Sequence, residues 1–227
     1  MSFVINAEVI ARAAMSAVDP TLVKKYASLV KFLSKFPTAA SAMHGSSAPA
    51  IGSKNYLERQ AAAFASSREP RAPKAPATVP DEMVSVILHE YFGIAASDLE
   101  QAKRQHLLSM GAENLVGDLL ERYLASILEP RGWIWCSGVM VKAVDFVKAP
   151  AQPGGEWRTL QVKNRDNSEN SSSSAIRNGT SIEKWHRTFS KKEGSNWDAF
   201  PDSALRQHLS ETAFKVYVRE YLRALRT

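Results

Sequence analysis

Hydrophobic positions in the first third of the chain recur every three or four residues, which is the period of an amphipathic helix. We expect a helix over residues 4–18 and a second helix that begins at Asp19 and ends before Pro37. Asp19 is a good N-cap, and Pro20 suits the first helical position. With a third helix expected over residues 55–67, this part of the sequence predicts a helical subdomain.

A proline-rich stretch, REPRAPKAPATVP, interrupts this pattern at residues 68–80 with four prolines and three basic residues. Such a composition is typical of an extended, polyproline-like segment. It is interpreted either as a solvated connector or as a basic arm that follows a nucleic-acid backbone. We place the subdomain boundary here, with an N-terminal helical subdomain over residues 1–66, a linker or arm over residues 67–80 and the main domain over residues 81–227.

Helical periodicity returns after this linker. A helix is expected over residues 81–93 and another over residues 97–110, where Ser97 and Glu100 have capping-box spacing. The strongest amphipathic pattern covers residues 112–128 and ends just before Pro130. Its hydrophobic positions are Leu115, Leu119, Tyr123 and Ile127.

The pattern then changes to runs rich in Val, Ile, Trp and Phe, which favour β-strands. Residues 132–147 predict two short strands with a turn at Ser137–Gly138, and residues 157–163 predict a further strand. We expect a helix over residues 181–189. Residues 214–218 are a candidate strand before a helical tail, and the whole series of elements predicts an α/β (α+β) fold.

Charge and cysteine content narrow the class of protein. The 227-residue chain carries a net charge of +6, which favours a polyanionic partner, most often nucleic acid and sometimes an anionic membrane. Its single cysteine, Cys136, excludes an internal disulfide and lies in an apolar run where a buried thiol is expected. Glu8 and Arg12 interrupt the N-terminal apolar stretch, and no segment approaches membrane-spanning length. We therefore expect a cytoplasmic protein with no membrane partner.

Candidate chemistry appears where two of the expected strands each carry a charged residue. Asp145 interrupts the apolar run VKAVDFV, and Lys163 ends the run LQVK. A turn lies between them, so the strands are expected to pair, and alternation places Gln161 on the same face as Lys163. A carboxylate that binds Mg²⁺ beside a lysine suits phosphodiester hydrolysis. The alternative is a structural Asp–Lys ion pair at the edge of the sheet.

The residues VDF…LQVK resemble the core of the PD-(D/E)XK nucleases, which implies a central mixed β-sheet flanked by helices. The resemblance implies Asp145 as a Mg²⁺ ligand and Lys163 as the residue that positions or activates the attacking water. Val144 stands in place of the proline, and Gln161 in place of the second acidic residue. Gln161 offers a carbonyl oxygen to the metal but no charge.

A second carboxylate is therefore sought elsewhere, and Glu121 on the expected helix 112–128 is the first candidate. It is expected to act both as a metal ligand and as part of the catalytic site, with a solvated helix face as the alternative. Glu113 is the second candidate, and Glu156 lies near a Gly-Gly turn.

The wider pattern GDLLERYLASIL, VDFV, LQVKNRDNSENSSSSAIRNGTSIEKWHRTF and NWDAFP resembles the SinI/AvaII-like group of Type II restriction endonucleases. The resemblance is strongest over residues 111–201. It implies a Mg²⁺-dependent endonuclease that reads the double-stranded palindrome GGWCC, where W is A or T. It also implies cleavage after the first G, short 5′ overhangs and pairing with a cytosine-C5 methyltransferase. A palindromic site implies two-fold symmetry, so a homodimer with one active site per strand is expected, and a monomer that nicks twice is the alternative.

In this interpretation residues 164–190 form the DNA-recognition segment of the nuclease core at residues 81–227. Its amide, hydroxyl and basic groups suit contacts with phosphates and base edges. The alternative for the Ser-rich part is a flexible polar loop. The expected DNA-binding residues are Arg165, Asn167, Asn170, Ser172, Ser173, Arg177, Asn178, Lys184 and Arg187.

Two other functions are consistent with the same residues. A repair or junction-resolving nuclease with this core would select DNA by structure and not by sequence. A non-catalytic DNA-binding protein would carry Gln161 as the mark of a decayed site, and it would show no Mg²⁺-dependent cleavage.

Overall fold

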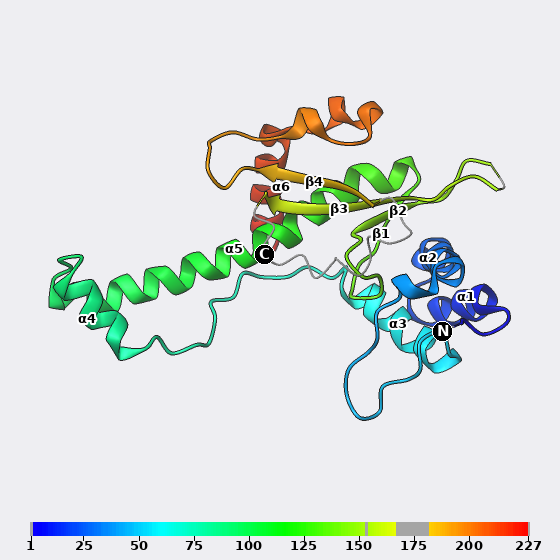
Figure 1. Ribbon diagram of the computed structural model, residues 1–227, viewed down its shortest axis with the longest axis horizontal. Helices are drawn as coiled ribbons and strands as arrows, with labels where there is room; N and C mark the ends of the chain where they lie inside the picture. The colour runs from blue at the N-terminus through cyan, green and yellow to red at the C-terminus, as the bar shows by residue number, and fades with distance from the viewer. Residues whose placement is uncertain (1, 153, 167–181, 227) are drawn as a thin grey trace.

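A mixed four-stranded sheet lies at the centre of the protein (Figure 1). The structure is a computed structural model that describes residues 2–152, 154–166 and 182–226. The strands follow the order β1-β2-β3-β4, with antiparallel pairing of β1 with β2 and of β2 with β3, and parallel pairing of β3 with β4. Their bounds are β1 (Trp133–Trp135), β2 (Phe146–Lys148), β3 (Arg158–Arg165) and β4 (Ile182–Thr188).

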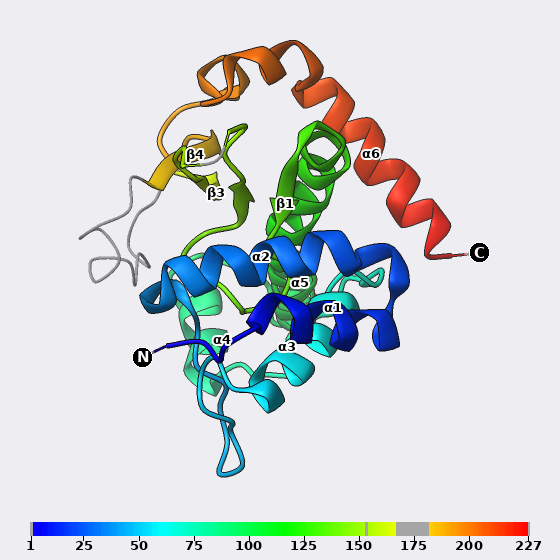
Figure 2. The ribbon, with the colours of Figure 1, turned by 90° about the vertical axis from the view of Figure 1, so that its right-hand side faces the viewer.

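The N-terminal helices form a layer beside the β1–β2 end of the sheet (Figure 2). This layer comprises α1 (Ala7–Val18), α2 (Val23–Lys35) and α3 (Lys54–Ser66). Its core of side chains such as Tyr26 and Phe64 is continuous with Ile134 and Val147 of the sheet.

The other face of the sheet packs against α5 (Leu99–Leu128) and α6 (Glu211–Ala224). The alternation of side chains along each strand produces the two faces. Trp133, Phe146, Leu160 and Trp185 enter the core with α5 and α6, whereas the neighbouring Ile134 and Val147 belong to the core of the N-terminal helices. Within the described ranges, no helix is long and apolar enough to cross a membrane.

The segment that joins α3 to α4 (Glu82–Glu90) has neither helix nor strand over residues 70–80. Its beginning is held by Arg122 of α5, a buried side chain whose guanidinium donates to the carbonyl oxygens of Ser67, Arg68 and Glu69. Further along, the segment crosses α5 closely at Gly111. The extended segment is thus fixed to the long helix at two points.

Most of the expected helices and strands are confirmed, including the Asp19 cap, whose carboxylate accepts the Thr21 N–H. The division at Gly111 is wrong, because residues 99–128 form one continuous helix. The expected capping box is also wrong: Ser97 lies before the helix, and its hydroxyl donates to the Asp98 carboxylate at 3.1 Å.

Two expectations for the C-terminal third are wrong. The helix expected over residues 181–189 is the strand β4, which pairs in parallel with β3 and buries Trp185. The candidate strand at residues 214–218 lies inside α6. There Ser210 caps the helix by accepting the Ala213 N–H, and Phe214 is buried against α5 and the sheet.

We predict that Gly111→Ala destabilises the protein. A Cβ atom at this position would lie 2.7 Å from the carbonyl oxygen of Lys74, whose backbone must then move. This overpacking is expected to cost about 1–3 kcal/mol, more than the roughly 0.5–1 kcal/mol that alanine gains over glycine in a helix.

The matched control is Gly117→Ala on the same helix, where a Cβ atom meets nothing within 4 Å. Urea unfolding should show lower stability for the first variant and slightly higher stability for the second. Equal gains in stability from both would show that the segment does not press on α5 at Gly111.

Candidate active site

Asp145 stands one residue before β2, and its side chain continues the hydrogen-bonding pattern between β2 and β3. The Val162 N–H donates to Asp145 Oδ2 at 2.6 Å, and the Asp145 N–H donates to the Leu160 carbonyl at 2.9 Å. Since Phe146 pairs with Leu160, extending the register by one residue places Asp145 opposite Gln161. The expected pairing of the two strands is confirmed, and it fixes the carboxylate on β3.

Gln161 and Lys163 follow on the same face of β3, as alternation requires. Gln161 is 5% exposed, whereas Lys163 is exposed to solvent. In the parallel register, Lys184 of β4 pairs with Gln161 and His186 pairs with Lys163. One face of the β3–β4 pair therefore carries a row of polar and basic side chains beside Asp145.

Glu121 reaches this region from α5. Its Oε2 atom accepts the Trp135 Nε1–H at 2.9 Å. Burial, and after it the charge of Asp145, raise the pKa of Glu121 to about 8, although the Trp135 hydrogen bond and the charge of Lys163 partly offset the increase. Glu121 is therefore close enough to interact electrostatically with both Asp145 and Lys163.

The two other candidate carboxylates lie elsewhere. Glu113 is exposed on α5 and stands eight residues before Glu121, about 12 Å along the helix axis. Glu156 is exposed before the start of β3. Among the three carboxylates considered, the structure brings Glu121 to Asp145.

Asp145 also titrates above the usual range of an aspartate. Burial raises its pKa to about 6, and the Val162 N–H and the charge of Lys163 partly offset this effect. Burial thus disfavours ionisation of both Asp145 and Glu121, and the two carboxylates interact electrostatically. A cation bound near them would stabilise their charged forms.

The donor set fits Mg²⁺. Among the described residues, no group of three or more His, Cys, Asp and Glu side chains is placed to hold a metal ion. Mg²⁺ does not need three, because it keeps several waters and is commonly bound through one or two carboxylates. Glu121 and Asp145 supply two carboxylates, and the neighbouring Gln161 offers an amide oxygen of the same hard type.

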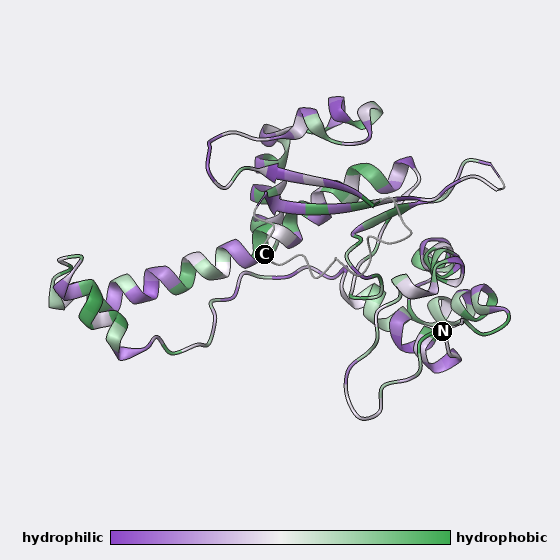
Figure 3. Cartoon of the chain, in the orientation of Figure 1, coloured by the Kyte–Doolittle hydropathy of each residue, from purple (hydrophilic) through white to green (hydrophobic). Residues whose placement is uncertain are grey.

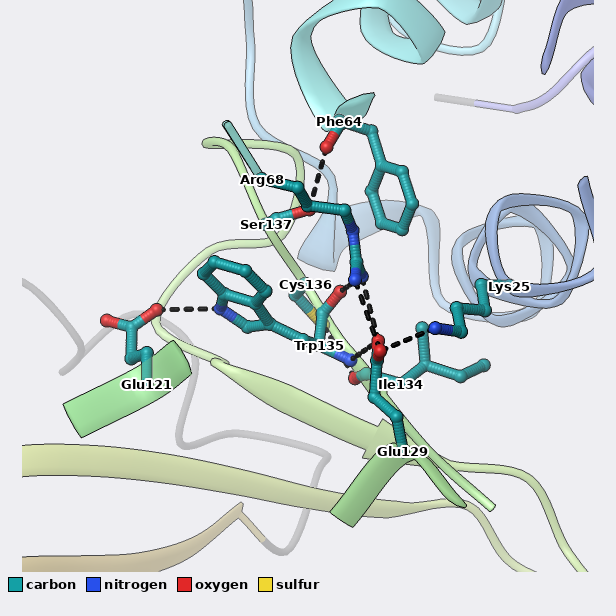
Figure 4. Close-up of polar contacts among 9 residues, drawn as sticks. All are labelled: Lys25, Phe64, Arg68, Glu121, Glu129, Ile134, Trp135, Cys136 and Ser137. Atoms are coloured by element: carbon teal, nitrogen blue, oxygen red, sulfur yellow. Dashed lines mark hydrogen bonds and ion pairs between the residues drawn. The ribbon is translucent and has the colours of Figure 1, made fainter. Parts of the chain in front are cut away.

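Trp135, which holds Glu121, is itself held by a network that sequence reasoning missed (Figure 4). The Trp135 N–H donates to Glu129 Oε1 at 3.2 Å, and the Trp135 carbonyl accepts from Arg68 Nη2 at 2.9 Å. Arg68 also pairs with Glu129 at 2.9 Å, and Lys25 pairs with Glu129 at 2.6 Å. Because these residues are far apart in the chain, no local signal in the sequence indicates the network.

The expected DNA-binding residues fall into three groups. Arg165 and Lys184 are exposed on the same sheet face as Lys163. Arg187 faces the other way: it pairs with Glu211 at 2.7 Å and donates to Asn164 Oδ1, so its donors are engaged within the protein. The others lie outside the described residues, namely Asn167, Asn170, Ser172, Ser173, Arg177 and Asn178.

The raised pKa values predict how stability depends on pH in the absence of metal. A carboxyl group whose folded-state pKa is raised stabilises the fold while protonated, and this contribution is lost as the pH rises through the folded-state pKa. For Glu121 that loss extends from its ordinary pKa of 4.5 to about 8. We therefore expect the metal-free protein to lose stability between about pH 5 and about pH 8.

Urea unfolding of the EDTA-treated protein across this pH range tests the prediction. Glu121→Gln should flatten the pH dependence, whereas Glu113→Gln on the exposed part of the same helix should leave it unchanged. Added Mg²⁺ should stabilise the wild type most at high pH. Identical pH profiles for the wild type and Glu121→Gln would contradict the placement of Glu121.

Comparison with known proteins identifies the family of this chain. The family model described as SinI restriction endonuclease matches residues 7–224. The Type II restriction enzyme Eco47I of Escherichia coli is 51% identical over 222 residues, covering 97% of this chain and 96% of the relative. The Type II restriction enzyme SinI of Salmonella infantis is 48% identical over 225 residues, covering 99% and 97%. The chain belongs to the SinI family of Type II restriction endonucleases.

Proposed function

We propose that this enzyme is a Mg²⁺-dependent nuclease with a PD-(D/E)XK core that cleaves double-stranded DNA at GGWCC. Cleavage falls after the first G and leaves short 5′ overhangs. The specificity rests on the resemblance of the polar segment after Lys163 to the SinI/AvaII-like group. The observation that carries the catalytic proposal is that Asp145, whose carboxylate accepts the Val162 N–H of β3, interacts electrostatically with Lys163 of β3 and with Glu121 of α5.

In this proposal Asp145, Glu121 and Gln161 hold Mg²⁺. Bound there, the metal polarises the phosphate and lowers the pKa of a coordinated water. The Asp145 carboxylate is oriented by the Val162 N–H, and the Glu121 carboxylate by the Trp135 indole. The exposed Lys163 ammonium positions the attacking water and stabilises the negative charge that develops on the phosphate.

The DNA lies over the face that carries Lys163, Lys184 and Arg165. All three side chains are exposed, and the net charge of +6 favours a polyanion on this surface. We include the polar residues between 167 and 178 in the recognition segment because short amide and hydroxyl side chains suit base edges and phosphates. We leave Arg187 out, because its ion pair with Glu211 stabilises the packing of β4 against α6.

The proposed biological setting is a restriction–modification system. A cytosine-C5 methyltransferase protects the same sites in the host DNA, and both enzymes act in the cytoplasm. Because GGWCC is palindromic apart from its central base pair, two copies of the chain each cleave one strand.

The test is a digest of a sequenced plasmid with and without Mg²⁺, followed by run-off sequencing of the fragment ends. Fragments ending at GGWCC with 5′ overhangs are the expected result. Discrete fragments from another sequence would keep the catalytic site and reject the specificity. Binding without cleavage in Mg²⁺ or Mn²⁺ would reject the catalytic proposal and support the interpretation of Gln161 as a mark of decay.

A further inference from the structure

A helical arm, defined as residues 81–110, projects from the rest of the protein (Figure 1). It consists of α4 and the first part of α5, which run beside each other away from the sheet and from the N-terminal helices. From Leu99 to Gly111 the helix α5 extends by about 18 Å. The arm therefore presents most of its surface to something other than its own chain.

Hydrophobic residues are concentrated on α4, whereas hydrophilic and hydrophobic residues alternate along the first part of α5 (Figure 3). Of the fifteen large hydrophobic side chains that are exposed among the described residues, eight lie in these thirty positions. No residue of α4 is buried, and Met83, Ile87 and Tyr91 recur at i, i+4 and i+8. The other five are Val84, Val86, Phe92, Leu108 and Met110.

The arm has the area that a stable protein interface requires. Tyr91 is 82% exposed and Phe92 is 65% exposed, so the two rings offer roughly 300 Å². That is about a third of the roughly 800 Å² that each partner buries in a standard interface, and six more exposed hydrophobic side chains lie elsewhere on the arm. A nine-residue helix such as α4 is also only marginally stable in water unless it packs against a partner.

Charge distinguishes the candidate partners. The arm contains five acidic residues (Asp81, Glu82, Glu90, Asp98 and Glu100) and two basic residues (Lys103 and Arg104), a net charge of −3. The whole chain carries +6, so the remainder carries +9. DNA phosphates would be repelled by the acidic arm, whereas the basic remainder of a second copy would attract it.

We propose that the arm docks on a second copy of this chain and forms the dimer. The choice of a second copy rests in part on the proposed function, because two-fold reading of a palindrome needs two active sites. Each copy inserts its apolar, acidic arm against the partner. The projecting shape, the exposed apolar side chains and the opposite charges of arm and body then have one explanation.

The first test is the mass of the purified full chain in solution, measured by light scattering after size-exclusion chromatography without DNA. The wild type should have the mass of two chains. The double variant Ile87→Glu/Tyr91→Glu should weaken the dimer by at least about 100-fold and elute as a monomer at the same concentration. The matched control is Ile5→Glu, an equally apolar side chain that is 90% exposed outside the arm and should remain dimeric.

A second measurement avoids any doubt about folding of the charged variant. The chain's only cysteine, Cys136, is buried, so Ile87→Cys introduces an accessible thiol that benzophenone maleimide labels selectively. Illumination should join two chains covalently through position 87. Ile5→Cys, labelled in the same way, should give mainly single chains.

The outcomes separate this proposal from the proposed function. A monomeric wild type, or a charged arm variant that remains dimeric, overturns the docking of the arm on a second copy. If the wild type is a monomer and the arm variant binds DNA more weakly than the wild type does, the arm contacts DNA instead. That result would also overturn the docking of the arm on a second copy. A dimer that depends on the arm but does not cleave GGWCC keeps the arm interface and rejects the specificity alone.

Discussion

Lys163→Ala is expected to lower the rate of DNA cleavage by about 10³-fold or more while leaving DNA binding nearly unchanged. The reason is that the Lys163 ammonium interacts with the carboxylates of Asp145 and Glu121 and is exposed on the face proposed to bind the phosphate. Removing one preorganised charge of this kind from a transition state costs about 10²–10³ in rate, and loss of water activation adds to it. Single-turnover cleavage of an oligonucleotide duplex, with binding measured by gel shift in Ca²⁺, separates the two effects.

The matched control is Lys54→Ala, because Lys54 is an exposed lysine on α3 whose partner is Glu58 at 3.7 Å. This variant should cleave at the wild-type rate. Lys163→Arg should restore the charge but not the position of the ammonium and should recover only part of the rate. Cleavage by Lys163→Ala within about tenfold of the wild type would remove Lys163 from the catalytic site.

Asp145→Asn is the second substitution with a large expected effect, because it separates the structural role of Asp145 from its chemical role. The asparagine carbonyl can still accept the Val162 N–H, so the junction of β2 and β3 should persist. The negative charge is lost, and with it most of the affinity for Mg²⁺. We expect cleavage to fall by about 10³-fold or more, while thermal unfolding without metal occurs at an equal or higher temperature at pH 8.

Asp145→Ala provides the contrast. It removes both the charge and the acceptor, so the Val162 N–H loses its partner at a cost of about 1–3 kcal/mol. The alanine variant should therefore be less stable than the asparagine variant, although cleavage should fall strongly in both. If Mg²⁺ stabilised Asp145→Asn as much as it stabilises the wild type, the metal would bind elsewhere.

The arrangement of Asp145, Gln161 and Lys163 could be predicted from the sequence because its geometry is local. Asp145 directly precedes β2 and Lys163 lies on β3, two consecutive strands joined by one turn, and the two-residue period of a strand fixes Gln161 and Lys163 on one face. The pairing and the shared face follow from short-range periodicity, which hydrophobic patterns record directly. The choice of Glu121 rested instead on the resemblance to the PD-(D/E)XK nucleases, which implies a helix glutamate near the metal.

The errors arose where contacts distant in the sequence decide the structure. The residues of β4 include good helix formers, yet parallel pairing with β3 and burial of Trp185 against Phe200 and Trp197 make them a strand. The sequence also predicts two separate helices, one on each side of Gly111. Gly111 lies within one helix, where the missing side chain admits the backbone of Lys74.

The support of the site was not predictable for the same reason. The indole that donates to Glu121 belongs to Trp135 of β1. The charged side chains that support the Trp135 backbone are Glu129, just after α5, and its ion-pair partners Arg68, just after α3, and Lys25 of α2. Only packing of the N-terminal helices against the sheet brings Lys25 and Arg68 to Glu129. Helices that looked like a separate unit thus contribute directly to the framework of the active site.

The parallel pairing of β3 with β4 has a practical consequence for changing what this enzyme recognises. The chain leaves β3 at Arg165, two residues after Lys163, and returns at Ile182, and the register fixes both points. Residues 166–181 could therefore be exchanged between relatives as a cassette whose ends are geometrically constant. Any replacement would remain attached to the strand that bears Lys163, the proposed catalytic lysine. An exchange that alters the DNA sequence recognised would therefore show how strongly recognition and cleavage are coupled.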